Sequence, residues 1–94
     1  MKQTNKTWYV YFVRCNDQSL YAGITTELSR RVTEHNSTSL KAAKYTRNKQ
    51  PVSLVYYESA TDRASASKRE WQLKQLSKEK KEQLVKHFTG ELKL

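Results

Sequence analysis

An alternating run of aromatic and β-branched residues, broken once by polar residues, most constrains how this chain can fold. The run reads WYVYFVRCNDQSLYAGIT, from Trp8 to Thr25. Aromatic and β-branched side chains favour β-strands, whereas the Asn-Asp pair in the middle favours a turn. We therefore expect strands over 8–14 and 20–25, joined into a β-hairpin by a turn over 16–19.

The length of the hairpin tip decides whether two tyrosines face the same side of the sheet. Side chains alternate along a strand, and residues directly opposite one another share a face. A two-residue tip pairs Tyr11 with Ile24 and puts Tyr11 and Tyr21 on opposite faces. A three-residue tip pairs Tyr11 with Gly23, which puts both tyrosines on one face and leaves room beside Tyr11. No Asn-Gly pair forces the shorter turn, so both alternatives stay open, and plain sheet tyrosines are the simpler interpretation.

The segments after the hairpin predict three helices and one more strand. Periodicity and capping residues place helices over 27–36, 62–76 and 77–87, and a third strand over 52–58. The order β-β-α-β-α-α predicts an α+β fold, a small three-stranded, mainly antiparallel sheet flanked by helices. The length leaves room for one domain, 1–94.

The charge of the chain favours a polyanionic partner. Eighteen Lys and Arg residues against nine Asp and Glu residues give a formal net charge of +9 at pH 7. Such an excess on a small domain is typical of nucleic-acid binding, and a charged surface that only keeps the protein in solution is the alternative.

Cysteine content and hydropathy favour a cytoplasmic protein. Cys15 is the single cysteine, so no internal disulfide forms, and we expect its thiol to be buried and structural. No apolar run approaches the roughly 20 residues that span a membrane, and the polar N-terminus does not resemble a signal peptide.

The first predicted helix carries polar side chains near its apolar stripe. Leu28, Val32 and His35 share one face, and Arg31 lies beside that stripe. The simpler interpretations are an arginine that reaches out from the edge of the core and a histidine at a helix end.

The second predicted helix has a carboxylate on its apolar stripe. Ala66, Glu70, Leu73 and Leu76 recur at spacings of four, three and three. A buried carboxylate is costly unless it is paired or holds a metal ion. The simpler interpretation is an ion pair, with Arg31 as the available partner.

These residues together resemble the GIY-YIG nuclease domain over about residues 7–88. YVY (9–11) stands where that family has Gly-Ile-Tyr, and YAG (21–23) where it has Tyr-Ile-Gly. The arginine, histidine and glutamate of the family's helices fall at Arg31, His35 and Glu70. The resemblance is closest to the small stand-alone bacterial GIY-YIG proteins, which carry stretches like AKYTR (43–47) and LVYYE (54–58).

Three departures from the family pattern stand out. Tyr9 replaces the Gly of the first motif, and Ala22 replaces the aliphatic residue of the second. Some members place an Asn late in the domain as a further active-site residue, whereas residues 71–94 contain none.

The resemblance implies a metal-dependent endonuclease that hydrolyses phosphodiester bonds in DNA, with structure selectivity or low sequence specificity. Arg31 then holds the scissile phosphate, and Glu70 holds a single Mg²⁺ or Mn²⁺. Tyr11 or Tyr21 relays a proton from water, once a nearby cation lowers the pKa of the phenol, and His35 is a third candidate base. These five residues are therefore the expected catalytic residues, and we expect both tyrosines, Arg31 and Glu70 to converge in one cleft.

The segment between the first helix and the third strand is the expected nucleic-acid-binding surface. It combines cations for phosphate contacts with one aromatic ring for stacking on a base: Lys41, Lys44, Tyr45, Arg47 and Lys49. We expect a monomer that contacts DNA, with a partner protein as a source of specificity, and Trp71 as a core residue. A binding module that keeps the fold without catalysis is the alternative function.

Overall fold

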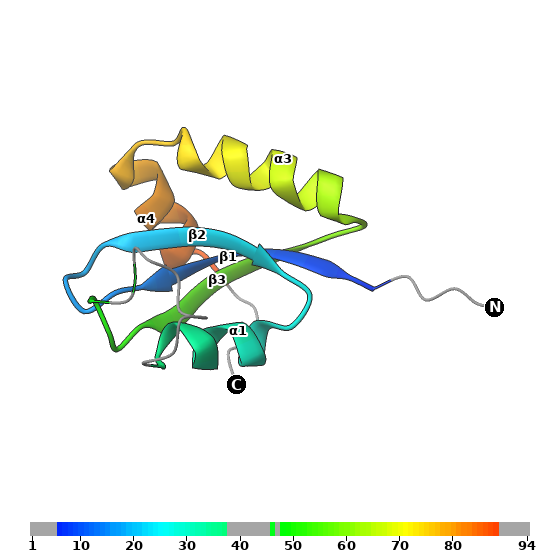
Figure 1. The fold of residues 1–94 in the computed structure, drawn as a ribbon. Coiled ribbons are helices and arrows are strands. Elements are labelled where there is room, and N and C mark those ends of the chain that lie inside the picture. The colour runs from blue at the N-terminus through cyan, green and yellow to red at the C-terminus, as the bar shows by residue number, and fades with distance from the viewer. Residues whose placement is uncertain (1–5, 38–45, 47, 89–94) are drawn as a thin grey trace.

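The computed structural model describes residues 6–37, 46 and 48–88 and has the predicted element order (Figure 1). Its sheet contains β1 (Trp8–Arg14), β2 (Leu20–Thr25) and β3 (Ser53–Ala60), all antiparallel, in the order β2-β1-β3. The helices are α1 (Leu28–His35), α3 (Arg63–Lys74) and α4 (Lys78–Lys86). The predicted α+β fold is confirmed. In the described part of the chain, no helix has the length and hydropathy needed to cross a membrane.

The hairpin has the three-residue tip. Tyr11 pairs with Gly23 and Val13 with Tyr21, so Tyr11 and Tyr21 point to the same face of the sheet. The tip closes through a hydrogen bond from the backbone N–H of Gln18 to the carbonyl oxygen of Cys15 at 2.9 Å. Gln18 adopts φ 73°, the left-handed conformation that ends a three-residue hairpin loop.

Replacing Gln18 by glycine is expected to stabilise the protein by about 0.5–1 kcal/mol. The left-handed conformation costs a residue with a Cβ about 1 kcal/mol, and glycine is free of that strain. The free energy of unfolding in urea measures the gain. Gln18→Ala is the control, because alanine loses the same side chain but keeps the Cβ. Equal stability of the two variants would contradict a strained tip.

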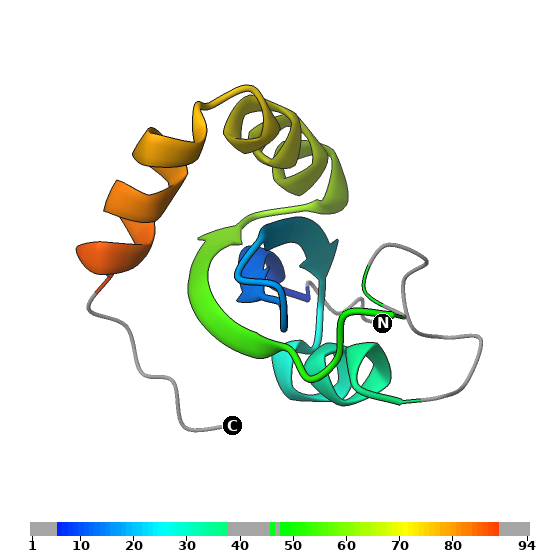
Figure 2. The same ribbon diagram turned by 90° about the vertical axis from the view of Figure 1, so that its left-hand side faces the viewer.

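The sheet lies between α1 on one face and α3 on the other (Figures 1 and 2). Each face of the sheet carries its own hydrophobic cluster. On the α3 side, Val10 and Phe12 of β1 pack with Ala66 and Leu73 of α3. On the α1 side, a second cluster is built around Tyr11, Val13, Cys15, Val52 and Leu54, with Leu28 and Val32 of α1 packed against it. The thiol of Cys15 is buried, as predicted.

Polar contacts fix the helices on the sheet. The carboxylate of Asp62 caps α3 by accepting a hydrogen bond from the backbone N–H of Ser65 at 2.7 Å. The guanidinium of Arg14 donates to both carboxylate oxygens of Glu82 at 2.5 and 2.7 Å, which ties α4 to the central strand.

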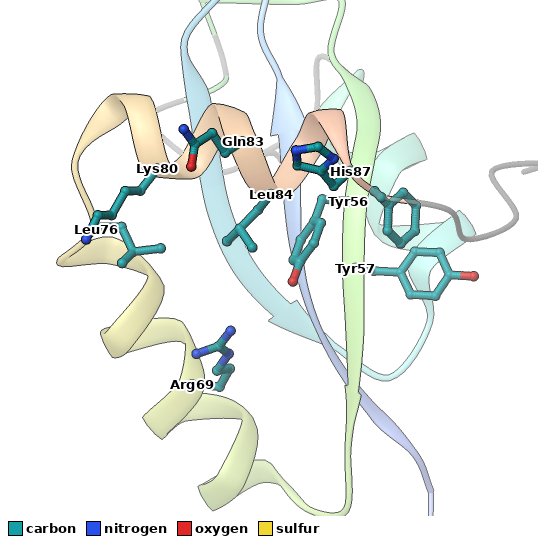
Figure 3. Close-up of a pocket in the computed structure, with 9 residues that line it drawn as sticks. Tyr56, Tyr57, Arg69, Leu76, Lys80, Gln83, Leu84 and His87 are labelled. Carbon is teal, nitrogen blue, oxygen red and sulfur yellow. The ribbon is translucent and has the colours of Figure 1, made fainter.

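A cavity of about 680 Å³ opens between α3, α4 and β3 (Figure 3). Tyr56 forms part of its floor, and its hydroxyl donates to the carboxylate of Glu58. Arg69 reaches the same carboxylate from α3, with N–O distances of 2.8 and 3.0 Å. The Glu58–Arg69 ion pair thus bridges α3 to the edge strand.

Candidate active site

Three buried polar side chains form a hydrogen-bonded chain beneath α1. The hydroxyl oxygen of Tyr11 lies 2.8 Å from Nε2 of His35, and Nδ1 of His35 lies 2.8 Å from the hydroxyl oxygen of Thr46. Tyr11 is 1% exposed, and His35 and Thr46 are 0% exposed. The predicted position of His35 at a helix end is confirmed, but its imidazole is fully inside the protein.

The end of α1 is held by the segment that leads into β3. The side chain of Asn36 donates to the carbonyl of Val52 at 3.0 Å and accepts from the backbone N–H of Val52 at 2.7 Å. The side-chain amide of Gln50 donates to the carbonyl of His35 at 2.8 Å. These contacts anchor the end of α1 that carries His35 to the segment before β3.

Gly23 makes the room in which the Tyr11 ring lies. A Cβ at Gly23 would lie 2.5 Å from the hydroxyl oxygen of Tyr11 and 2.7 Å from Cζ. Only a residue without a side chain fits opposite Tyr11 at this register. The second motif therefore needs its glycine for the Tyr11 ring.

Tyr21 contacts the same imidazole as Tyr11. The ring centroids of Tyr21 and His35 are 5.4 Å apart at an interplanar angle of 69°, and those of Tyr11 and His35 are 5.9 Å apart. Both distances are in the range of favourable edge-to-face contacts. Both motif tyrosines therefore meet at His35, on the face covered by α1.

Arg31 acts on this cluster from α1. Its guanidinium lies 2.9 Å from a carboxylate oxygen of Glu34, and its side chain is 23% exposed. Its positive charge acts to lower the pKa of Tyr11, so the guanidinium lies within electrostatic reach of the phenol. Arg31 thus joins the buried cluster to the surface.

Glu70 approaches from α3, on the other layer. Its carboxylate lies 3.3 Å from Nζ of Lys74, and its side chain is 22% exposed. Its charge raises the pKa of Tyr11, so the carboxylate lies within electrostatic reach of the Tyr11 hydroxyl. The predicted ion pair between Glu70 and Arg31 is wrong, because within the described residues Glu70 pairs with Lys74 one helical turn away.

Burial sets the protonation of Tyr11 and His35. Burial raises the pKa of Tyr11 to about 12, even though the Arg31 charge acts in the opposite direction. Burial, assisted by the Arg31 charge, lowers the pKa of His35 to about 4. The expected lowering of a tyrosine pKa by Arg31 is therefore outweighed for Tyr11, and both groups are neutral at pH 7.

The residues near Glu70 fit a weakly coordinated cation. In residues 6–37, 46 and 48–88, no group of three or more His, Cys, Asp or Glu side chains could hold a metal ion. Mg²⁺ is commonly held by one or two carboxylates, with waters and substrate phosphates completing its shell. The partly exposed carboxylate of Glu70 fits that arrangement.

The predicted nucleic-acid-binding residues lie mostly outside the described part of the chain. This holds for Lys41, Lys44, Tyr45 and Arg47. Lys49 is described, and its ammonium lies 2.5 Å from a carboxylate oxygen of Asp17 at the hairpin tip. Its charge is therefore partly neutralised.

Two features of the site region differ from the sequence-based expectations. Trp71 is 64% exposed, so its prediction as a core residue is wrong. It follows Glu70 by about 100° around α3 and so faces solvent. Thr46 contacts His35, and Glu34 contacts Arg31. Neither Thr46 nor Glu34 was predicted as a site residue. The AKYTR stretch that contains Thr46 was the available signal.

Comparison with known proteins agrees with this geometry. The family model for the GIY-YIG catalytic domain matches residues 7–83. The chain therefore belongs to the GIY-YIG family.

Its relatives include small proteins of similar length. A UPF0213 protein of Desulfotalea psychrophila is 58% identical over 79 residues, which cover 84% of this chain and 71% of that protein. One from Haloquadratum walsbyi is 47% identical over 85 residues, 90% of this chain and 93% of that protein.

Two solution NMR structures share the fold. A UPF0213 protein from Bacillus halodurans has a TM-score of 0.53 and 42% identity, with 85% of this chain and 83% of that chain covered. A protein from E. faecalis has a TM-score of 0.56 and 40% identity, with 90% of each chain covered.

Proposed function

We propose that this protein is a metal-dependent endonuclease that hydrolyses phosphodiester bonds in DNA, with structure selectivity or low sequence specificity. The observation that carries the proposal is the meeting of Tyr11, Tyr21 and Arg31 at one buried histidine, with Glu70 in electrostatic reach. Membership in the GIY-YIG family supports a nuclease, and the net charge of +9 supports a polyanionic substrate.

Arg31 is the group that binds the scissile phosphate. A guanidinium presents paired N–H donors that match phosphate oxygens, and it stays protonated at all working pH values. Its side chain is partly exposed, while Tyr11 and His35 are not. A phosphate bound there replaces or shares the contact with Glu34 and lies beside the Tyr11 hydroxyl.

Glu70 is the group that holds the metal ion, and its contact with Lys74 gives way to the cation. When bound, Mg²⁺ or Mn²⁺ stabilises charge on the phosphate oxygens and on the leaving oxygen. Glu70 comes from α3 and Arg31 from α1, so a phosphodiester between them meets groups from both layers of the protein.

The burial of His35 narrows the choice of proton acceptor. The imidazole of His35 is buried, and both of its ring nitrogens lie 2.8 Å from hydroxyl oxygens of the protein, so a direct role as base is disfavoured. The Tyr11 hydroxyl lies 2.8 Å from Nε2 of the neutral His35 ring, so Tyr11 can pass its proton to that nitrogen. Tyr21 packs edge-on against the same ring and lines the site.

The test is metal-dependent cleavage of single-stranded, flapped and branched DNA by wild type and by Glu70→Gln. Loss of the carboxylate charge is expected to lower cleavage by roughly 10²-fold or more, the scale of one major electrostatic stabiliser. Metal-free DNA binding should stay constant or tighten, because a negative charge near phosphate is removed. Glu79→Gln, an exposed carboxylate on α4, is the matched control and should cleave normally.

Two outcomes would reject parts of this proposal. If Glu70→Gln lowers the melting temperature but leaves cleavage unchanged, Glu70 is a structural residue and not a metal ligand. If wild type binds DNA in a salt-sensitive way but cleaves none of the substrates with Mg²⁺ or Mn²⁺, the protein is a nucleic-acid-binding module.

A further inference from the structure

We propose that Thr46 is a positioning residue that fixes the tautomer of His35, so that Nε2 of His35 is the proton acceptor for Tyr11. The inference rests on the proposed nuclease function and deepens it. It assigns a task to the fully buried hydroxyl of Thr46, which is not among the five expected catalytic residues.

The first step is the direction of the hydrogen bond between Tyr11 and His35. Among the described residues, the hydrogen-bond partner of the Tyr11 hydroxyl is Nε2 of His35, at 2.8 Å. The Arg31 guanidinium, which acts on Tyr11 through its charge, only donates and so cannot accept the phenol proton. The buried phenol proton therefore points to Nε2, which accepts it.

The second step places the proton of the imidazole. His35 is neutral at pH 7 because burial and the Arg31 charge lower its pKa. A neutral imidazole with an accepting Nε2 carries its proton on Nδ1. Nδ1 lies 2.8 Å from the hydroxyl oxygen of Thr46, which accepts that proton in a hydrogen bond.

The third step is what Thr46 contributes. Without the Thr46 hydroxyl, a buried N–H on Nδ1 loses its hydrogen bond, which disfavours that tautomer. The other tautomer, with the proton on Nε2 donated to the Tyr11 oxygen, leaves the Tyr11 proton without its acceptor. Without Thr46 each tautomer therefore leaves one buried donor unpaired, and the preference for a proton on Nδ1 is lost. When Nε2 carries the imidazole proton, it cannot accept a proton from Tyr11, and proton transfer from Tyr11 to His35 is blocked.

When Nε2 of His35 accepts the Tyr11 proton, every proton of the hydrolysis is accounted for. Water gives a proton to the Tyr11 oxygen while the Tyr11 proton passes to Nε2 of His35. The resulting hydroxide forms a bond to phosphorus, the bond to the leaving oxygen breaks, and solvent protonates that oxygen. His35 is then an imidazolium that keeps its Nδ1–H bond to Thr46 and returns its proton to solvent through Tyr11.

Substrate makes this imidazolium more favourable. The groups that face His35 are Tyr11 from β1, Tyr21 from β2, and Arg31 and Glu34 from α1. Arg31 disfavours a positive charge on the ring, and Glu34 favours it. A phosphate bound to Arg31 offsets the unfavourable charge, so proton uptake is coupled to substrate binding.

The experiment combines ¹⁵N NMR of the His35 ring with cleavage assays on wild type and on variants of Thr46. Protonated and unprotonated ring nitrogens have widely separated ¹⁵N shifts, so the spectrum reads the tautomer directly. Thr46→Val keeps the shape but removes the hydroxyl, and Thr46→Ser restores the hydroxyl. Thr33→Val, at an exposed hydroxyl on α1, is the matched control.

The proposal predicts a proton on Nδ1 in wild type, in Thr46→Ser and in the Thr33→Val control. In Thr46→Val the tautomer with the proton on Nε2 becomes populated beside the Nδ1 tautomer, and cleavage falls in proportion to the fraction with the proton on Nδ1, with DNA binding unchanged.

A wild-type proton on Nε2 overturns the proposal whether or not the protein cleaves DNA. An unchanged tautomer in Thr46→Val, or a serine variant that behaves like valine, overturns it as well. If Thr46→Val does not fold, wild type and Thr46→Ser still decide the tautomer. Absent cleavage by wild type with the proton on Nδ1 rejects the nuclease function while leaving the tautomer assignment intact.

Discussion

Replacing Gly23 by alanine is expected to destabilise the protein by about 3 kcal/mol and to abolish the contact between Tyr11 and His35. The new Cβ would lie 2.5 Å from the Tyr11 hydroxyl oxygen, and the ring is too buried to move aside. Overpacking of this kind costs about 1–3 kcal/mol, and a buried hydrogen bond lost with it adds a similar amount. In a domain of this size such a loss lowers the melting temperature by roughly 10–20 °C.

A double-mutant cycle with Tyr11→Leu identifies the cause. Leucine removes the ring atoms that the new Cβ meets, so Gly23→Ala should cost much less in that background. Gly23 does not have a positive φ, so alanine fits its backbone conformation. An equal cost in both backgrounds would show that the contact with Tyr11 is not the reason for glycine.

The second large effect is a loss of roughly 3 kcal/mol of stability between about pH 6.5 and pH 4. The pKa of His35 is about 4 in the folded protein and near 6.5 in the unfolded chain. Within that window the unfolded chain binds the proton more tightly, so acid favours unfolding. The contribution of His35 is complete above pH 6.5 and is lost as the pH falls through 4.

Urea unfolding at pH 7, 6, 5 and 4.5 measures this slope. His35→Gln should flatten it, whereas His87→Gln, at an exposed histidine just after α4, should keep it. Glu82, whose hydrogen bond from Arg14 lowers its pKa, loses its own contribution only at still lower pH. Wild-type stability that is flat from pH 7 to 4.5 would contradict a buried neutral His35.

The pattern of the sequence was enough to predict the order of the elements, whereas the candidate site residues came from the resemblance to the GIY-YIG family. Alternation in β1 and β2 and periodicity in α1 are local properties, and they put Tyr11, Tyr21 and Arg31 on known faces. The tip length was not predictable, because Gln18 adopts a conformation that usually calls for glycine or asparagine. The register that unites the tyrosines was therefore known only from the structure.

Properties that depend on the surroundings of a residue were harder to predict. The pKa of Tyr11 follows from burial, which no spacing of residues reveals. Trp71 was expected inside because it is large and apolar, but its angular position on α3 exposes it. Thr46 is distant from His35 in the chain, and its hydroxyl gained significance only when the fold placed it at Nδ1.

Arg69 and Glu70 are neighbours in the chain but project from α3 in directions about 100° apart. Arg69 lines the cavity (Figure 3) and holds the helix to β3 through Glu58. Glu70 lies within electrostatic reach of Tyr11. Successive residues of a helix are about 100° apart, so α3 cannot rotate to move one side chain without moving the other. We therefore expect evolutionary changes at Arg69 and at Glu70 to be coupled. A sequence change that alters the bridge from Arg69 to β3 therefore also changes the orientation of the Glu70 carboxylate. Substitutions beside the cavity are in this way coupled to the geometry of the Tyr11 site.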